Sequence, residues 1–207
     1  MDKDDLVVLG AGGHARALLS LAELNQLRVT ALIDKNAGDN EIIMGKPVFP
    51  NTEFLDNSSS FSAVVGVGDN LVRKKQLDEF REFIVPRALK HPSAILDPTA
   101  QVGYFCQIFA GTFIGPMANI SDNVIINTHA VIEHEARIGS HSHISVGAKV
   151  LGRANIGDLC FIGAGAVIKD GIRVCSNVTI GANSFVNKNI DVPGVYVGTP
   201  VRKVDDK

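Results

Sequence analysis

The sequence lacks the features of several protein classes. It contains no tryptophan, and aromatic residues make up only 6% of its 207 residues, so a core anchored by large aromatic side chains is not expected. Proteins that bind nucleic acids without sequence preference need an excess of basic residues, and this chain has none, because its formal net charge is −2. No apolar run approaches the roughly 20 residues needed to cross a bilayer, and the acidic N-terminus does not resemble a signal peptide. We therefore expect no nucleic-acid binding and no membrane insertion.

Cysteine is also scarce. Cys106, Cys160 and Cys175 form no CxxC pair, and three cysteines cannot all pair within one chain. Reduced thiols in a cytoplasm fit this usage best. We predict a cytoplasmic protein in which Cys106 and Cys160 pack in the core.

The sequence is rich in aliphatic residues at every sixth position. From Leu96 to Val192, all 17 positions at this spacing are Leu, Ile or Val, and the residue four places later is mostly small. A period of six matches neither an α-helix nor a simple alternating strand. It fits a triangular prism in which three hexads make one coil and the aliphatic side chains point inward. We predict a parallel β-helix of five to six coils over residues 92–207.

Residues 1–91 are predicted to form a separate Rossmann-like α/β unit. Residues 6–35 indicate a strand, a glycine turn with a helix, and a second strand; a third strand over 62–68 precedes a helix from Leu71 to about Glu82, followed by a strand near 83–85. Gly10, Gly12 and Ala15 fit the pattern G-x-G-x-x-G/A, whose small residues let the backbone approach phosphate groups. Because the unit is too short for a full NAD domain, a nucleotide-linked ligand is favoured over NAD and over a purely structural turn.

Four of the six histidines lie between His129 and His143. A coil of three hexads would stack His134 between Pro116 and Gly152, and would place His143 on another face. The cluster is therefore spread out, and we expect no metal site. Acid–base catalysis is the other interpretation, because acyl transfer from a thioester to an amine requires a group that takes a proton and returns it. Glu133 and Glu135 both flank His134 and would favour its protonated form.

Scattered basic residues in the repeat have two interpretations. They attract the phosphates of a CoA molecule, or they belong to an ordinary solvated face. They are Lys149, Arg153, Lys169 and Arg173.

The combination of these motifs resembles one known group of enzymes. The opening Gly10-Ala-Gly-Gly-His14, the short α/β unit, Ile132-Glu-His-Glu135 and the hexapeptide prism are together typical of bacterial hexapeptide-repeat sugar acetyltransferases. These act on nucleotide-linked 4-amino-4,6-dideoxy sugars, and sialic-acid O-acetylating enzymes are their relatives. The resemblance implies a left-handed β-helix and a homotrimer that binds acetyl-CoA between neighbouring prisms, with active sites between subunits. It also implies direct acetyl transfer to the C4 amine of a UDP-, dTDP- or GDP-linked sugar for bacterial glycan biosynthesis.

The resemblance assigns roles by position. His134 corresponds to the general base and Glu135 to the acid that raises its basicity, while His143 and the backbones of Ala164 and Ala182 correspond to acetyl-CoA contacts. Ala164 and Ala182 are separated by three hexads, so the period itself places them on one edge of the prism. The nucleotide-sugar contacts correspond to Gly12, Gly13, His14, Asp34, Lys35 and Gly68, with Lys35 departing from the usual residue. O-acetylation of sialic acid or another sugar hydroxyl, and a non-catalytic scaffold, remain the alternatives.

Overall fold

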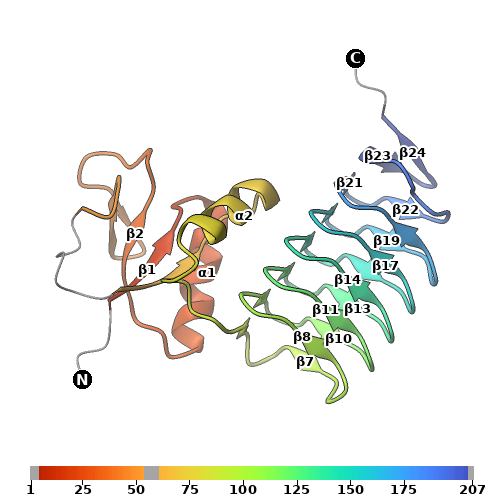
Figure 1. The fold of residues 1–207 in the computed structure, drawn as a ribbon, viewed down its shortest axis with the longest axis horizontal. Coiled ribbons are helices and arrows are strands. Elements are labelled where there is room, and N and C mark those ends of the chain that lie inside the picture. Colours follow the sequence, from red (N-terminus) through yellow and green to blue (C-terminus); the bar gives the residue numbers. More distant parts are fainter. Residues whose placement is uncertain (1–4, 54–60, 205–207) are drawn as a thin grey trace. The chain divides into compact units, whose positions relative to one another are not determined.

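A computed structural model describes residues 5–53 and 61–204 of the chain (Figure 1). The chain divides into two compact units, residues 1–89 and 90–207. Within the described residues, no helix is long and apolar enough to span a membrane.

The first unit is a small α/β fold around one sheet. Its strands run in the order β3-β4-β2-β1-β5, all parallel except the β3–β4 hairpin. The parallel strands are short apolar runs, as expected of strands covered on both faces. The elements are β1 (Asp5–Leu9), α1 (Gly13–Leu24), β2 (Val29–Ile33), β3 (Ile42–Ile43), β4 (Lys46–Phe49), β5 (Phe61–Val65) and α2 (Asn70–Glu79).

Close packing between α1 and the sheet depends on a glycine. A Cβ at Gly66, directly after β5, would lie 2.5 Å from the Val8 side chain and 3.1 Å from the Ala15 Cβ. The expected strand near residues 83–85 is reduced to one bridge between Ala63 and Ile84. The β3–β4 hairpin was not predicted from the sequence.

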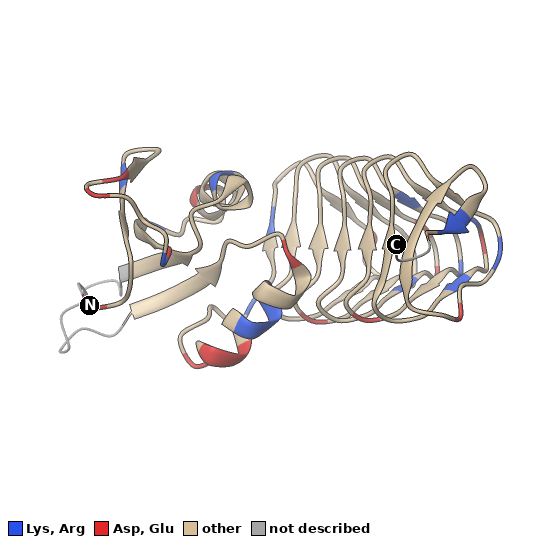
Figure 2. Cartoon of the chain, turned by 90° about the horizontal axis from the view of Figure 1, so that it is seen from above, with Lys and Arg blue, Asp and Glu red and all other residues tan. Residues whose placement is uncertain are grey.

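The second unit is the predicted prism, with three sheets whose neighbouring strands are parallel and separated by three hexads, except at the β23 and β24 end of the third sheet (Figures 1 and 2). The first sheet contains β7 (Ile95–Leu96), β10 (Phe113–Ile114), β13 (Val131–Ile132), β16 (Lys149–Val150), β19 (Val167–Ile168) and β22 (Phe185–Val186). The second contains β8 (Gln101–Val102), β11 (Asn119–Ile120), β14 (Arg137–Ile138), β17 (Asn155–Ile156) and β20 (Arg173–Val174). The third contains β6 (Leu89–Lys90), β9 (Gln107–Ile108), β12 (Ile125–Ile126), β15 (His143–Ile144), β18 (Phe161–Ile162), β21 (Val178–Ile180), β23 (Gly194–Gly198) and β24 (Val201–Lys203).

Each coil turns at three sharp corners. Every sixth residue from Phe105 to Asn183 has a positive φ, between 53° and 67° except at Gly171, where it is 71°. The residue after each corner, which is small in most hexads, is buried as predicted, and Cys106 and Cys160 occupy two of these positions. The backbone therefore turns the same way at every corner, whichever side chain stands there.

The aliphatic repeat fills the prism over most of its length. The repeat residues from Ile108 to Val186 are at most 1% exposed. The ends of the run depart from the predicted pattern: Leu96 and Val102 are only half-buried, and Val192 is 54% exposed. Ile190 is buried instead and bridges to Val174, because after β22 the chain leaves the hexad register to form the β23–β24 hairpin that ends the third sheet.

Candidate functional site

A cavity of about 660 Å³ lies at the carboxyl ends of β1, β2 and β5. This end of a parallel sheet is where α/β folds bind their ligands. All six predicted nucleotide-sugar contacts line the cavity, although they come from three separate segments. They are Gly12, Gly13, His14, Asp34, Lys35 and Gly68.

The N-terminus of α1 opens into this cavity without a cap. Its N-cap residue, Gly12, provides no side-chain hydrogen bond, and the first turn contains no acidic residue. A Cβ at Gly12 or Gly13 would meet no atom within 4 Å, so the backbone N–H groups of the turn are accessible. By contrast, the Asp69 carboxylate caps α2 by accepting a hydrogen bond from the Val72 N–H. The N-terminal end of α1 is suited to bind an anion such as a phosphate.

Asp34, directly after β2, holds the glycine turn in place. One carboxylate oxygen accepts a hydrogen bond from the Ala11 N–H at 3.0 Å, and the other accepts one from the Asn36 N–H at 3.0 Å. Each oxygen retains a second lone pair, which is available to a ligand hydroxyl.

Arg73, on α2, supports the other side of the cavity and was not singled out from the sequence. Its side chain is fully buried and donates to the Gly68 carbonyl at 3.0 Å and to the Asn70 side-chain oxygen at 2.9 Å. The hydrogen bond to Gly68 fixes the turn that follows β5. Only its burial distinguishes this arginine from an ordinary exposed residue of a helix. Burial is visible in the folded structure and not in the sequence.

One polar atom in the cavity wall has no partner. The side-chain oxygen of Gln76, on α2, is buried without a hydrogen bond in the described part of the chain, and Gln76 and Phe80 both line the cavity. Buried acceptors are normally satisfied, so this oxygen is an unsatisfied acceptor beside the cavity, although the atom itself is not exposed.

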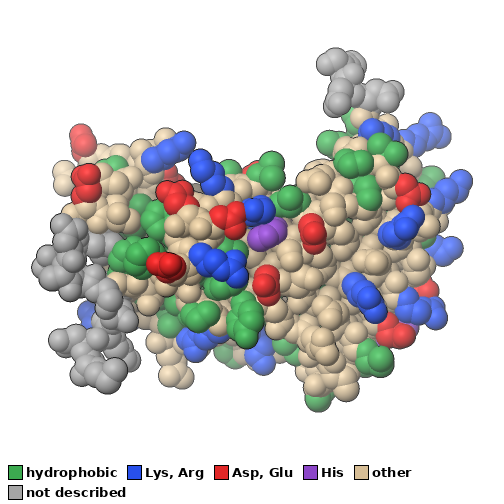
Figure 3. All heavy atoms as spheres, viewed as in Figure 1, with side chains coloured by type: hydrophobic (Ala, Val, Ile, Leu, Met, Phe, Trp, Pro, Cys, Tyr) green, Lys and Arg blue, Asp and Glu red, His purple; other side chains and the backbone are tan. Residues whose placement is uncertain are grey.

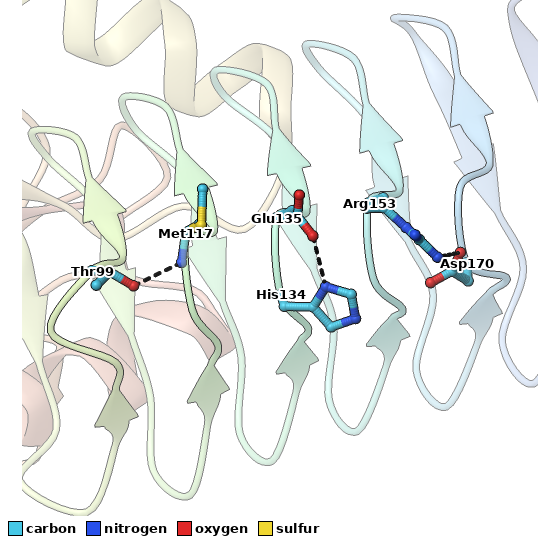
Figure 4. Close-up of polar contacts among 6 residues, drawn as sticks. All are labelled: Thr99, Met117, His134, Glu135, Arg153 and Asp170. Atoms are coloured by element: carbon cyan, nitrogen blue, oxygen red, sulfur yellow. Dashed lines mark hydrogen bonds and ion pairs between the residues drawn. The ribbon is translucent and has the colours of Figure 1, made fainter.

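In the prism, His134 and Glu135 form a hydrogen-bonded pair at one corner (Figure 4). The distance from His134 Nδ1 to a Glu135 carboxylate oxygen is 3.1 Å, and the two side chains are 45% and 49% exposed. Glu135 is the positive-φ corner residue. Because a carboxylate only accepts hydrogen bonds, Nδ1 is the donor in this pair, and in the neutral imidazole Nε2 then carries no proton.

Arg153 and Asp170 form an ion pair on the next coils at the same corner (Figure 4). Arg153 Nη2 lies 2.6 Å from Asp170 Oδ1. The pKa of Arg153 is raised, first by the hydrogen bond and charge of Asp170 and also by Glu135. Arg153 is therefore already neutralised by a carboxylate, as is Arg173 by Asp191. Neither is a free cation for a CoA phosphate.

The other three clustered histidines lie away from His134. His129 and His141 occupy different corners, and His141 contacts the Asn123 side chain at 2.9 Å. His143 is 6% exposed, packs edge-on against Phe161 and lies 3.2 Å from the Asn127 side-chain nitrogen. In the described ranges, no three His, Cys, Asp or Glu side chains are grouped so that they could hold a metal ion.

Ala164 and Ala182 lie on one edge of the prism, where the Asn183 N–H donates to the Ala164 carbonyl at 2.8 Å. Their own N–H groups make no hydrogen bond within the described residues. The edge therefore presents N–H donors on successive coils. Charged side chains of both signs lie on the visible face of the prism, and the basic ones are more frequent toward its C-terminal end (Figure 3).

Comparisons with known families agree with both units. Residues 5–80 match the PglD N-terminal domain, and residues 153–188 match the hexapeptide repeat of succinyl-transferase. No curated protein sequence matches the chain.

Solved structures match over nearly the whole chain. The acetyltransferase domain of PglB from Neisseria gonorrhoeae is 29% identical, with a TM-score of 0.88 over 98% of this chain and 100% of that one. Its complex with acetyl coenzyme A is 28% identical over the same shares, again with a TM-score of 0.88. A variant of GDP-perosamine N-acetyltransferase from Caulobacter crescentus, in complex with CoA and GDP-perosamine, is 26% identical, with a TM-score of 0.90 over 98% of this chain and 97% of that one. These matches confirm the predicted fold class, including the left-handed β-helix, and the resemblance to sugar acetyltransferases.

Proposed function

We propose that this chain, an acetyl-CoA-dependent sugar acetyltransferase built on hexapeptide repeats, transfers acetyl to the C4 amine of a nucleotide-linked 4-amino-4,6-dideoxy sugar. The PglB domain was solved with acetyl coenzyme A, and the Caulobacter enzyme with CoA and GDP-perosamine. The proposal carries these ligand classes over to this chain, in a cytoplasmic pathway of bacterial glycan biosynthesis.

The observation that carries the proposal is the cavity of the first unit. It gathers the six predicted substrate residues around an uncapped helix N-terminus. Backbone N–H groups there suit the diphosphate, and the free lone pairs of Asp34 suit ribose hydroxyls. A non-catalytic scaffold has no use for such a site.

His134 is the proposed general base. With Nδ1 bonded to Glu135, Nε2 takes a proton from the amine as its nitrogen attacks the thioester carbonyl carbon. The tetrahedral intermediate then collapses, the C–S bond breaks, and His134 returns the proton to the departing CoA sulfur. Glu135 orients the imidazole and stabilises its transient positive charge. No covalent acyl-enzyme is needed.

Acetyl-CoA is proposed to lie along the edge formed by Ala164 and Ala182, whose free N–H groups face its pantetheine arm. His143, the third predicted cofactor contact, is nine residues from His134, which is half a coil. The two histidines of one prism therefore cannot both face the same groove. The proposed active site therefore lies between neighbouring prisms of a homotrimer.

Thiol release from acetyl-CoA tests this function. The enzyme is supplied in turn with UDP-, dTDP- and GDP-linked 4-amino sugars and with free sialic acid. We expect thiol release with one nucleotide-linked amine. In His134→Ala the rate of this release should fall by about 10²- to 10⁴-fold. Release with sialic acid alone would indicate O-acetylation instead. If the protein bound no acyl-CoA, a non-catalytic scaffold would be the remaining interpretation.

A further inference from the structure

The second ring nitrogen of the proposed base, Nε2, lies against Gly152 on the next coil. A Cβ at Gly152 would lie 2.5 Å from His134 Nε2, so the imidazole edge occupies the space left by this glycine. Because Nδ1 points to Glu135 (Figure 4), Nε2 is directed along the stack toward the following coils. An amine that gives its proton to Nε2 must approach there.

Asp170 lies close to the same glycine. The same Cβ at Gly152 would lie 2.8 Å from Asp170 Oδ2, while Oδ1 of this carboxylate pairs with Arg153. One oxygen is therefore held by the guanidinium, and the other is directed at the approach to His134. Positions 134, 152 and 170 follow one another at intervals of one coil, so the backbone fixes their order.

We infer that Asp170, held by Arg153, is the residue that makes the site select an amine over a hydroxyl. The inference rests on the proposed function. In the attacking complex, the amine directs one N–H toward His134 Nε2 and a second toward Asp170 Oδ2.

The proton balance of the reaction explains the selectivity. The first N–H proton passes to His134 and then to the CoA sulfur, while the N–C bond forms and the C–S bond breaks. The second N–H remains on nitrogen and becomes the amide N–H of the product, so Asp170 retains its hydrogen bond throughout. A sugar hydroxyl has only one proton, which His134 takes, and its oxygen lone pairs would then face the Asp170 carboxylate. The carboxylate thus favours the amine and disfavours the hydroxyl.

The test compares two substrates in Asp170→Asn. These are the nucleotide-linked 4-amino sugar that the thiol-release panel selects and its 4-hydroxy counterpart, measured with acetyl-CoA by thiol release and product mass. We expect kcat/KM for the amine to fall about 10- to 100-fold, the usual range for a lost hydrogen bond to a charged group. We expect the rate with the hydroxyl to stay within about threefold or to rise, because the repulsion is removed. Arg153→Gln, which frees the carboxylate, should give a smaller loss in the same direction.

Asp191→Asn is the matched control. Asp191 pairs with Arg173 at the same 2.6 Å distance, several coils farther along the prism than His134, and its loss should change neither rate. The inference is overturned if Asp170→Asn leaves the amine rate unchanged, or if it lowers the amine and hydroxyl rates equally. A wild-type chain that acetylates no amine overturns the proposed function itself, and the inference with it.

Discussion

The imidazole of His134 lies over Gly152, where a side chain would otherwise stand. A Cβ at Gly152 would be 2.5 Å from Nε2 and 2.6 Å from Cε1 of His134, closer than any van der Waals contact allows. The proposed base therefore keeps its orientation through two features: the hydrogen bond to Glu135 and the missing side chain on the next coil.

Gly152→Ala should accordingly displace the base without unfolding the prism. We expect kcat to fall about 100-fold, since a shift of about 1 Å has this effect in a catalytic group. Nucleotide-sugar binding, measured by calorimetry, should not change, because the cavity lies in the other unit. Gly38→Ala is the control, because its Cβ would stay 3.9 Å from the nearest atom. Normal turnover in Gly152→Ala would contradict the assignment of His134.

Glu135→Gln should lower kcat and leave KM for both substrates nearly unchanged. The amide oxygen can still accept the Nδ1 proton, but its bond to a transient imidazolium is not charge-assisted. We expect a loss of about 5- to 10-fold, the difference between a neutral and a charged hydrogen bond. Steady-state kinetics measure it, and Glu135→Asp should restore part of the rate. A loss confined to KM would show that Glu135 binds substrate instead.

The six-residue period predicted most of the prism and one important neighbour of the proposed base. Because partners in adjacent coils are separated by three hexads, the sequence placed Gly152 beside His134, as the structure has it. The residues themselves left Glu133 and Glu135 as equal candidates to assist the base. The structure distinguishes them, because the corner conformation at Glu135 brings its carboxylate to Nδ1.

The period could not predict contacts made across the stack or beyond the repeat. Arg153 pairs with Asp170, which is not its partner in the repeat, because a long side chain reaches diagonally between columns. Val192 satisfies the pattern but is exposed, since the chain has already left the prism. The role of Arg73 depends on tertiary burial, which the sequence of a short, mostly polar helix does not encode.

Arg73→Met should weaken nucleotide-sugar binding from a distance. It removes the donor to the Gly68 carbonyl and leaves the turn after β5 without this support. We expect the free energy of unfolding to fall by about 2–4 kcal/mol and KM for the nucleotide sugar to rise, with KM for acetyl-CoA unchanged. Lys74→Met, next to it on α2 but exposed, should cost under about 0.5 kcal/mol. An equal rise in both KM values would contradict a local role.

Ala182→Phe tests the proposed acetyl-CoA edge. Ala182 is exposed on the corner column, so a phenyl ring is accommodated by the fold but covers the neighbouring N–H groups. We expect KM for acetyl-CoA to rise at least about tenfold, equivalent to about 1.4 kcal/mol, while binding of the nucleotide sugar without acetyl-CoA is retained. Asn155→Phe, on β17 in a different sheet of the same unit and also exposed, is the comparison. Unchanged kinetics in Ala182→Phe would place the cofactor elsewhere.

The cysteines predict how the native protein behaves toward thiol reagents and alkali. Burial raises the pKa of Cys160 to about 11, and Cys106 is fully buried. At pH 8 we therefore expect Ellman's reagent to modify at most one thiol per native chain, the half-buried Cys175, and all three after unfolding.

Because the thiol of Cys160 ionises more readily when unfolded, its contribution to stability is complete below pH 9 and is lost as the pH rises toward 11. Cys160→Ala, which places the usual small residue of the repeat there, should reduce this alkaline decrease in Tm. An identical decrease in both proteins would assign it to another group.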